Sequence, residues 1–163
     1  MNEIRIGVIG SGFMGRTHVD AANKLDSTIP VAITSGSRAA QVGSDYGIDV
    51  EPSVQSLVNR DDIDAVVIAT PHWLHHEEAM AAANAGKHVL VEKPMATSLE
   101  HCDEMIAEFN KRGLTLSVGY HQRFRESNYT TRHLIQAGEI GQVRCIQMSA
   151  LFDITALRSD PGF

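Results

Sequence analysis

Cysteines and long apolar runs are scarce in this sequence of 163 residues. The two cysteines, Cys102 and Cys145, are far apart in the chain, which argues against a disulfide framework and favours a reducing cytoplasm. No stretch approaches the roughly 18 consecutive apolar residues of a membrane span. The N-terminus also lacks a basic region followed by a long apolar core, so we expect neither a membrane segment nor a signal peptide.

Basic residues are the minority among the charges, with 14 Lys and Arg against 20 Asp and Glu and a formal net charge of -6. Nucleic acids and anionic membranes favour basic surfaces, so we expect neither as a partner. Apolar residues make up 43% and charged residues 21%, as in ordinary soluble globular proteins. A chain of this length can form one domain with a full core and part of another.

Short β-branched runs alternate with helical stretches, which predicts an α/β fold with a doubly wound parallel sheet. The predicted strands cover residues 4–9, 31–34, 65–70, 88–91 and 114–118. The predicted helices cover residues 13–25, 39–46, 54–58 and 74–85, with caps at Ser53, Gly47 and Gly86, and a last helix is opened by a capping box over Thr97–Glu100 and ended by Gly113. The first helix should bury Met14, Ala21, Ala22 and Leu25, and the last should bury Leu99, Cys102, Ile106 and Phe109.

The pattern changes near residue 121, where we place a domain boundary. Residues 1–121 form the first domain in this interpretation, and residues 122–163 are too few for an ordinary second one. They predict a helix over 128–137 and a half-exposed strand over 143–152. We therefore expect the beginning of a second α/β domain that is incomplete in this sequence.

Gly10, Gly12 and Gly15 form a G-x-G-x-x-G motif between the first predicted strand and the first predicted helix. Gly10 allows the tight turn, Gly12 lets the backbone approach a pyrophosphate, and Gly15 lets the helix pack closely on the strand. The helix N-terminus, with Phe13 and Met14 in the turn, attracts phosphate charge. This context predicts a dinucleotide-binding domain of the Rossmann type, and a glycine turn without a ligand is the alternative.

The end of the second predicted strand bears on which dinucleotide binds. NAD-preferring sites place an Asp or Glu about 20 residues after the motif, on the ribose 2′-hydroxyl. Residues 34–38 contain no acid here. The hydroxyls of Ser35 and Ser37 and the guanidinium of Arg38 suit a 2′-phosphate, so we expect NADP to be preferred, with NAD as the other option. The alternative is that Arg38 is a solvated surface residue and that the site uses either coenzyme.

Three clusters follow predicted strands, at the edge where ligands bind in doubly wound sheets, and they span residues 70–75, 92–94 and 119–124. With the glycine motif and His18, the sequences Thr-Pro-His-x-x-His and Glu-Lys-Pro resemble the Gfo/Idh/MocA oxidoreductases in type and order. Residues 85–96 and 120–124 are especially similar, although many members have Asn in place of Gln122. The likeness covers nearly the whole chain, and residues 35–37 are most like members related to glucose–fructose oxidoreductase and the dihydrodiol dehydrogenases, which use NADP.

The resemblance implies an NAD(P)-dependent dehydrogenase that transfers a hydride between nicotinamide and a hydroxyl-bearing carbon of a sugar, cyclitol or dihydrodiol (a CH-OH or CH-CH donor). It implies that Lys93 is catalytic, beside nicotinamide and a small-molecule substrate, and that Glu92 and Pro94 shape its turn, with a cis bond at Pro94 as one option. The expected dinucleotide contacts are Gly10, Gly12, Phe13, Met14, Gly15, Ser35, Ser37, Arg38, Thr70, Pro71, His72, His75, Glu92, Lys93 and Arg123.

The resemblance also implies parts that this sequence does not contain. An acid–base histidine motif of the second domain is absent before Phe163, so we expect an incomplete active site. The large sheet of that domain often mediates dimerisation in the family, which leaves a homo-oligomer open.

Lysine chemistry supports a catalytic role for Lys93 independently, because a lysine at a strand end can donate a hydrogen bond to a substrate oxygen and exchange a proton with it. An exposed surface lysine is the alternative.

We expect no metal site, because His72, His75 and His76 lack neighbouring carboxylate or cysteine ligands. A ligand contact and a packing role both stay open for His18, Trp73, His75, Tyr120 and Arg123. A non-catalytic NAD(P)-binding or redox-sensing module is the alternative function, and the retention of Lys93 favours the enzyme.

Overall fold

The structure is a computed structural model that describes residues 3–149. Internal contacts divide the chain between Gly119 and Tyr120, so residues 3–119 and 120–149 are described separately. That the second part begins another α/β domain stays a prediction.

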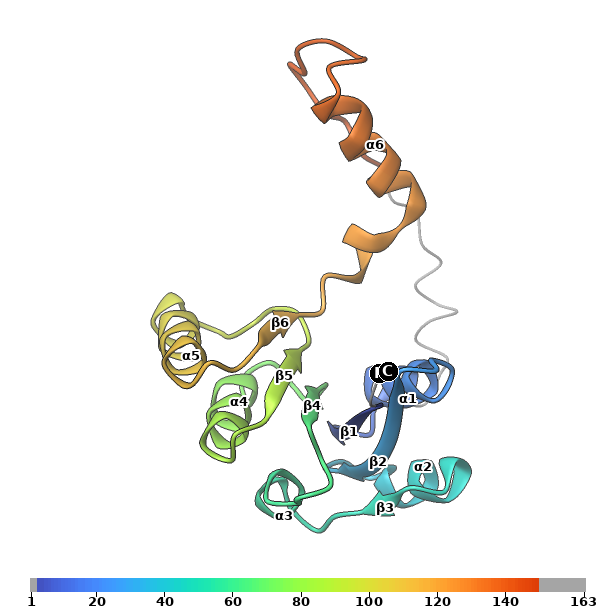
Figure 1. The fold of residues 1–163 in the computed structure, drawn as a ribbon, viewed down its shortest axis with the longest axis vertical. Helices are drawn as coiled ribbons and strands as arrows, with labels where there is room; N and C mark the ends of the chain where they lie inside the picture. The colour runs from blue at the N-terminus through green and yellow to red at the C-terminus, as the bar shows by residue number, and fades with distance from the viewer. Residues whose placement is uncertain (1–2, 150–163) are drawn as a thin grey trace. The chain divides into compact units, whose positions relative to one another are not determined.

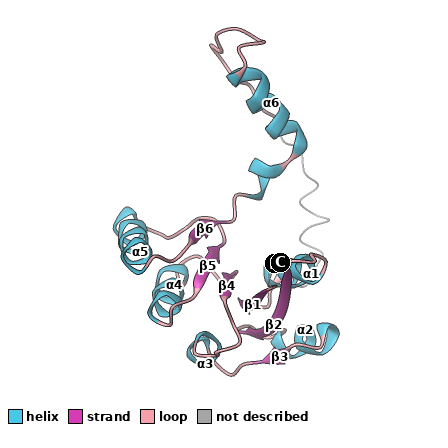
Figure 2. Cartoon of the chain, in the orientation of Figure 1, coloured by secondary structure: helices cyan, strands magenta, loops and turns pink. Residues whose placement is uncertain are grey.

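The first unit is built on one parallel sheet of six strands in the order β3-β2-β1-β4-β5-β6 (Figure 1). The strands are β1 (Ile4–Ile9), β2 (Thr28–Thr34), β3 (Asp49–Val50), β4 (Ala65–Ile68), β5 (His88–Val91) and β6 (Leu116–Val118). The connecting helices are α1 (Phe13–Asn23), α2 (Ala39–Tyr46), α3 (Val54–Val58), α4 (His75–Asn84) and α5 (Leu99–Arg112). The predicted α/β fold with a doubly wound sheet is confirmed, and Figure 2 shows the alternation of strands and helices along the chain.

Each face of the sheet has its own core, because neighbouring residues of a strand point to opposite faces. Val8 of β1 joins a cluster with the helices α1 and α2, made of Val8, Val19, Ile33, Ala39, Val42 and Val67. Ile9, the next residue, joins the larger cluster with α3, α4 and α5, which includes Leu57, Val66, Ile68, Ala79, Val91 and Phe109. Both faces of β1 and β4 are therefore covered, as a parallel sheet requires.

Helix ends follow the sequence in most places. Ser53 caps α3 by accepting a hydrogen bond from the backbone N–H of Ser56, and Gly47 and Gly113 end α2 and α5 in the left-handed conformation. The capping box predicted to start at Thr97 is wrong by one residue, because Ser98 is the N-cap of α5 and accepts from the backbone N–H of His101. Both hydroxyl residues can cap a helix, and the packing of α5 selects the second.

Two predicted helix faces are also corrected. In α1 the buried residues are Gly15, Val19 and Ala22, whereas Leu25 lies beyond the helix and is 57% exposed. The close contact between Gly15 and the glycine turn fixes the rotation of α1, and Val19 and Ala22 follow on the same face. In α5 the buried residues are Met105 and Phe109, while Leu99, Cys102 and Ile106 are not part of the buried core.

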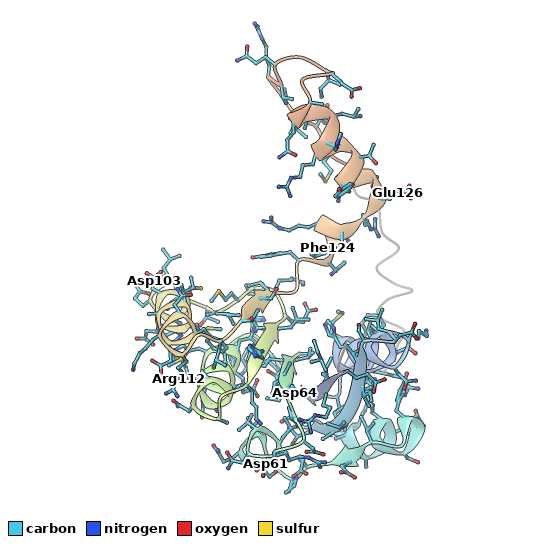
Figure 3. All side chains as sticks on the ribbon, in the orientation of Figure 1. Asp61, Asp64, Asp103, Arg112, Phe124 and Glu126 are labelled. Atoms are coloured by element: carbon cyan, nitrogen blue, oxygen red, sulfur yellow. The ribbon has the colours of Figure 1, made fainter. Side chains whose placement is uncertain are left out.

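The amino edge of the sheet is closed by ion pairs. Arg5 at the start of β1 binds Asp64 with an Nη2–Oδ1 distance of 2.7 Å. Asp64, labelled in Figure 3, lies just before β4. The hydrogen bonds from Arg5 lower the pKa of the Asp64 carboxyl to about 2. Arg60 makes a second group, with carboxylate partners Asp49, Glu51 and Asp62. Arg5 and Asp64 therefore neutralise one another at the amino edge, whereas the Arg60 group connects the loop before β4 with β3 and the residue after it.

The second unit contains a 3-10 helix, η1 (His121–Phe124), and the helix α6 (Glu126–Gln136), which starts two residues before the predicted helix. The strand predicted over 143–152 is wrong for residues 143–149, which have no regular secondary structure, and residues 150–152 lie outside the described range. A strand needs a neighbouring strand for its N–H and C=O groups, and the described part of this unit offers none. Between residues 3 and 149, the structure contains no helix with the length and apolar character needed to cross a membrane.

Candidate functional site

Four strands end at the same level of the sheet. Ile9 of β1 pairs with Thr34 of β2 and with Ile68 of β4, and Ile68 pairs with Val91 of β5. The backbone continues this ladder for one residue, since the N–H groups of Gly10, Ala69 and Glu92 donate to the strand beside each of them over 2.8, 2.8 and 2.9 Å. The loops that follow these strands therefore meet at one edge, and they contain most of the predicted site residues.

The glycine turn lies at the centre of this edge. Gly10 has a positive φ of 109°, and a Cβ there would lie 2.7 Å from the carbonyl group of Ala69, so only glycine fits. A Cβ on Gly15 would lie 1.8 Å from the Gly10 oxygen, which shows how tightly α1 packs on the turn. Gly12, the N-cap of α1, differs from both, because a Cβ there would meet nothing within 4 Å. The turn is thus tightly packed at Gly10 and Gly15, whereas Gly12 faces open space.

The loop after β2 is held against the glycine turn by Ser11. Ser35 and Gly36 both have positive φ, 66° and 87°, so the chain turns back towards β1. A Cβ on Gly36 would lie 2.6 Å from Ser11 Oγ, and this buried hydroxyl accepts a hydrogen bond of 3.2 Å from the backbone N–H of Arg38. Ser37 is exposed and Arg38 is half-buried. Sequence analysis assigned no role to Ser11, although its place inside the glycine motif was a usable signal.

The loop after β4 places Pro71, His72 and Trp73 on the surface, with the two rings in edge contact at 5.5 Å. Trp73 is 65% exposed, so the packing alternative for this residue is not supported. Thr70, at the start of the loop, donates its hydroxyl to Glu78 Oε2 of α4. Glu78 is 7% exposed and lies on the side of α4 that faces the core.

Burial raises the pKa of the Glu78 carboxyl to about 7, because the charged form loses its hydration; the hydrogen bond from Thr70 opposes this shift, and the charge of Glu77 adds to it. Sequence analysis missed Glu78. The available signal was a glutamate on the apolar stripe of a helix otherwise rich in alanine, where a charged residue needs a partner.

His75 connects the loop after β4 to the turn after β5. Its Nε2 lies 2.9 Å from the carbonyl oxygen of Thr70 and its Nδ1 lies 2.8 Å from that of Pro94, and the side chain is 1% exposed. Carbonyl oxygens only accept, so the ring holds both at once only when each nitrogen carries a proton. Because both nitrogens are engaged and buried, the His75 ring has no polar atom exposed for contact with a ligand.

The turn after β5 exposes Lys93 and buries Glu92. The Lys93–Pro94 peptide bond is cis, the option noted from the sequence. Glu92 is 6% exposed; its Oε1 lies 2.9 Å from His18 Nε2 on α1, and its Oε2 accepts from the backbone N–H of Lys93 over 3.1 Å. The Lys93 side chain is left at the surface of the edge. His18 had been considered as a groove or packing residue, and its pairing with Glu92 could not be inferred from the sequence.

Arg123 belongs to the second unit and is described only there. Its guanidinium lies 5.6 Å above the ring of Tyr120, and both residues are exposed. A contact between Arg123 and a dinucleotide stays a prediction. In the described residues, no three His, Cys, Asp or Glu side chains are grouped as metal ligands would be.

The strand order, the glycine turn and the aligned strand-end loops define a Rossmann domain of the kind that binds nicotinamide dinucleotides. The chain belongs to the Gfo/Idh/MocA family, since the family model described as an oxidoreductase family with an NAD-binding Rossmann fold matches residues 4–120. The resemblance stated from the sequence is thereby confirmed.

Two relatives are named as dehydrogenases. A 4-carboxy-2-hydroxymuconate-6-semialdehyde dehydrogenase of Sphingobium sp. is 36% identical over 140 residues, which are 84% of this chain and 44% of that protein. An inositol 2-dehydrogenase/D-chiro-inositol 3-dehydrogenase of Halalkalibacterium halodurans is 37% identical over 151 residues, 87% of this chain and 43% of that protein. This chain therefore spans less than half the length of these relatives.

A solved structure gives the same result for the fold. The scyllo-inositol dehydrogenase of Lactobacillus casei, with bound NAD(H) and scyllo-inositol, superimposes with a TM-score of 0.81 at 29% identity. The superposition covers 86% of this chain and 43% of that one.

The buried carboxyl of Glu78 makes stability depend on pH. Its pKa is about 7 in the folded protein against 4.5 in its ordinary state, so the folded protein holds a proton that the unfolded chain releases. The free energy of unfolding should therefore fall as the pH rises from about 5 to 8, by about 1–2 kcal/mol because the site keeps some contact with solvent. Glu78→Gln should remove this fall and be more stable than wild type at the higher pH. Urea unfolding at the two pH values measures both, with the exposed Glu139→Gln as control; an unchanged slope in Glu78→Gln would contradict the assignment.

Proposed function

We propose that this chain is the coenzyme-binding part of an NAD(P)-dependent dehydrogenase, acting on a hydroxyl-bearing carbon of a sugar, cyclitol or dihydrodiol. The observation that carries the proposal is the glycine turn at the aligned carboxyl ends of β1, β2, β4 and β5. In this turn Gly12 faces open space, whereas Gly15 is packed against the backbone of Gly10. The exposed Lys93 at the same edge supplies a group for proton transfer.

The residues at this edge fit a dinucleotide. The space above Gly12 would admit a diphosphate against the N-terminal end of α1, where the helix dipole is positive and no acidic residue occupies the first turn. Thr70 and Pro71 would line the groove beside it, and Phe13 and Met14 follow the cradle in the first turn of α1. His72 and Trp73 extend this surface outwards. The buried His75 and Glu92 would support the groove from behind.

We propose that NADP is the preferred coenzyme. The loop after β2 carries hydroxyls at Ser35 and Ser37 and a guanidinium at Arg38, and it lacks the carboxylate that would repel a 2′-phosphate. The hydrogen bond from the Arg38 backbone to Ser11 holds this loop against the glycine turn. A phosphate on the ribose would then meet the loop through charge-assisted hydrogen bonds.

In the proposed reaction Lys93 is the catalytic residue. When bound, the nicotinamide ring would supply the hydride chemistry at its C4 position. Lys93 Nζ would donate a hydrogen bond to the substrate oxygen and take up or return the proton of the hydroxyl group. The backbone of Lys93 is held by Glu92 and by the turn at Pro94, so the long side chain starts from a fixed point. Substrate contacts and a further acid–base group would come from the rest of the enzyme, as the greater length of the relatives suggests.

Coenzyme binding is the first test. Reduced coenzyme should bind the chain and quench Trp73, its single tryptophan, with energy transfer to the nicotinamide. Gly12→Ala should weaken binding by at least about tenfold, because the new methyl group occupies the space above the turn, and should leave the unfolding free energy within about 0.5 kcal/mol. Fluorescence titration and urea unfolding measure the two effects. No binding of any nicotinamide coenzyme to folded wild type would refute the proposal.

Coenzyme preference is a separate prediction. NADPH should bind more tightly than NADH, and Arg38→Ala should remove most of the difference, with an expected loss of about tenfold for NADPH and little change for NADH. Titration of both coenzymes against wild type and variant decides this. Tighter binding of NADH by wild type would overturn the preference and leave the coenzyme site itself unaffected.

The role of Lys93 requires the whole enzyme. Lys93→Ala should lower kcat by at least about 100-fold, because proton transfer at the substrate oxygen is lost, while the Kd for the reduced coenzyme changes little. NADP-dependent oxidation of scyllo-inositol and related polyols is the assay with which to begin. A variant with wild-type turnover would remove Lys93 from the mechanism.

A further inference from the structure

We propose that the contact between the half-buried His18 and the buried Glu92 positions the turn that carries Lys93 with respect to α1, the helix that begins at the glycine turn. Glu92 and His18 are positioning residues in this proposal, because they act through the backbone of Lys93 and not on a ligand. The functional meaning of the link rests on the proposed coenzyme site, whereas the link itself is testable without coenzyme.

The Glu92 carboxylate is surrounded on three sides. Oε1 lies 2.9 Å from His18 Nε2, and Oε2 accepts from the Lys93 N–H over 3.1 Å. A Cβ placed on Gly119 would lie 3.1 Å from Oε1 and 3.2 Å from the carboxyl carbon, so the end of β6 closes the third side. Only 7% of the Glu92 side chain is exposed, against 20% of that of His18. The carboxylate thus joins α1, the turn after β5 and the end of β6.

Because the Glu92 carboxylate is buried, it depends on the hydrogen bonds that it accepts. A carboxylate removed from water is costly unless hydrogen-bond donors take the place of the lost water. Within the described residues, Glu92 receives two donors from different elements, one from the His18 ring and one from the Lys93 backbone. If the His18 donor is lost, Glu92 must turn towards water, and it can do so only by releasing the Lys93 N–H.

The other possible uses of the pair fit the geometry less well. A direct ligand contact would require a polar atom at the surface, and the ring nitrogen of His18 is directed at a carboxylate that is itself buried. A purely local cap is also excluded, because His18 belongs to α1 and Glu92 directly follows β5, 74 residues further along the chain. What the contact does is fix one element against another.

The contact between His18 and Glu92 connects the two functions proposed for this edge, which are coenzyme binding at the glycine turn and proton transfer by Lys93. The helix α1 begins directly after its N-cap Gly12 and includes Gly15, which is packed on the turn, and His18 lies nearly one turn further along the same helix. The other end is the residue directly before Lys93. An ordered α1 therefore holds the Lys93 backbone in place, and loosening the pair should affect coenzyme affinity and Lys93 placement together.

The experiment compares His18→Leu with His18→Gln. The amide of glutamine can donate from nearly the position of Nε2, whereas leucine offers no donor. Hydrogen exchange of the Lys93 backbone amide, followed by NMR in the coenzyme-free protein, should be about tenfold faster in His18→Leu and within about threefold of wild type in His18→Gln. His133→Leu, a change at an exposed histidine of α6, is the control and should leave this amide unaffected. Equal exchange in wild type and His18→Leu, or equally fast exchange in both His18 variants, would overturn the proposal.

A second variant covers the case in which His18→Leu does not fold. Glu92→Met has a side chain of similar length and offers no carboxylate oxygen to either partner, so it should speed exchange of the Lys93 amide to the same extent. Fluorescence titration with NADPH then separates this proposal from the proposed function. We expect His18→Leu and Glu92→Met to weaken NADPH binding by about three- to tenfold and His18→Gln to retain it. If wild type binds no coenzyme, the proposed function fails, and the exchange data alone decide whether the pair positions Lys93.

Discussion

Everything at the candidate site depends on the register of the parallel sheet. Ile9, Thr34, Ile68 and Val91 are paired directly across the four central strands, so the loops after β1, β2, β4 and β5 begin at the same level. Parallel pairing forces each connection to return through a helix, which leaves only strand-end loops at this edge. A slip of one residue in any pair would turn a predicted ligand contact towards the core.

Charge is distributed differently over the two edges of the sheet. At the amino edge, Arg5 pairs with Asp64, and both side chains are about 40% exposed, so this ion pair contributes little net stability. At the carboxyl edge, two acids are buried and have partners of another kind, a hydroxyl for Glu78 and a histidine for Glu92. The cost of burying these groups is difficult to explain by stability alone, because apolar residues of similar size would serve the cores better. Their positions behind the strand-end loops associate them with the site.

Much of the fold could be predicted because local rules and tertiary packing agree. The glycine motif, the apolar strands and the glycine caps each specify their own conformation, and the model of the family confirms the resemblance that the motifs carried. The errors occur where packing selects among equivalent local patterns. Periodicity allowed two overlapping apolar stripes on α5, and contact with the sheet selected the one with Met105 and Phe109.

The interactions behind the site were beyond prediction for a related reason. His18 and Glu92 are far apart in the sequence, and Thr70 meets Glu78 only because α4 folds back on the loop before it. The strand predicted near the end of the sequence failed because alternation of side chains does not supply a partner strand.

His75 sets the distance between the loop after β4 and the turn after β5. A planar five-membered ring bridges the carbonyls of Thr70 and Pro94, and a ring of this kind neither stretches nor bends. The imidazole is therefore a rigid spacer between the carbonyl oxygens of Thr70 and Pro94, which lie 2.9 and 2.8 Å from its two nitrogens. A longer or shorter side chain at this position would widen or narrow the gap, although the residue itself lies inside the protein, on a helix behind the edge.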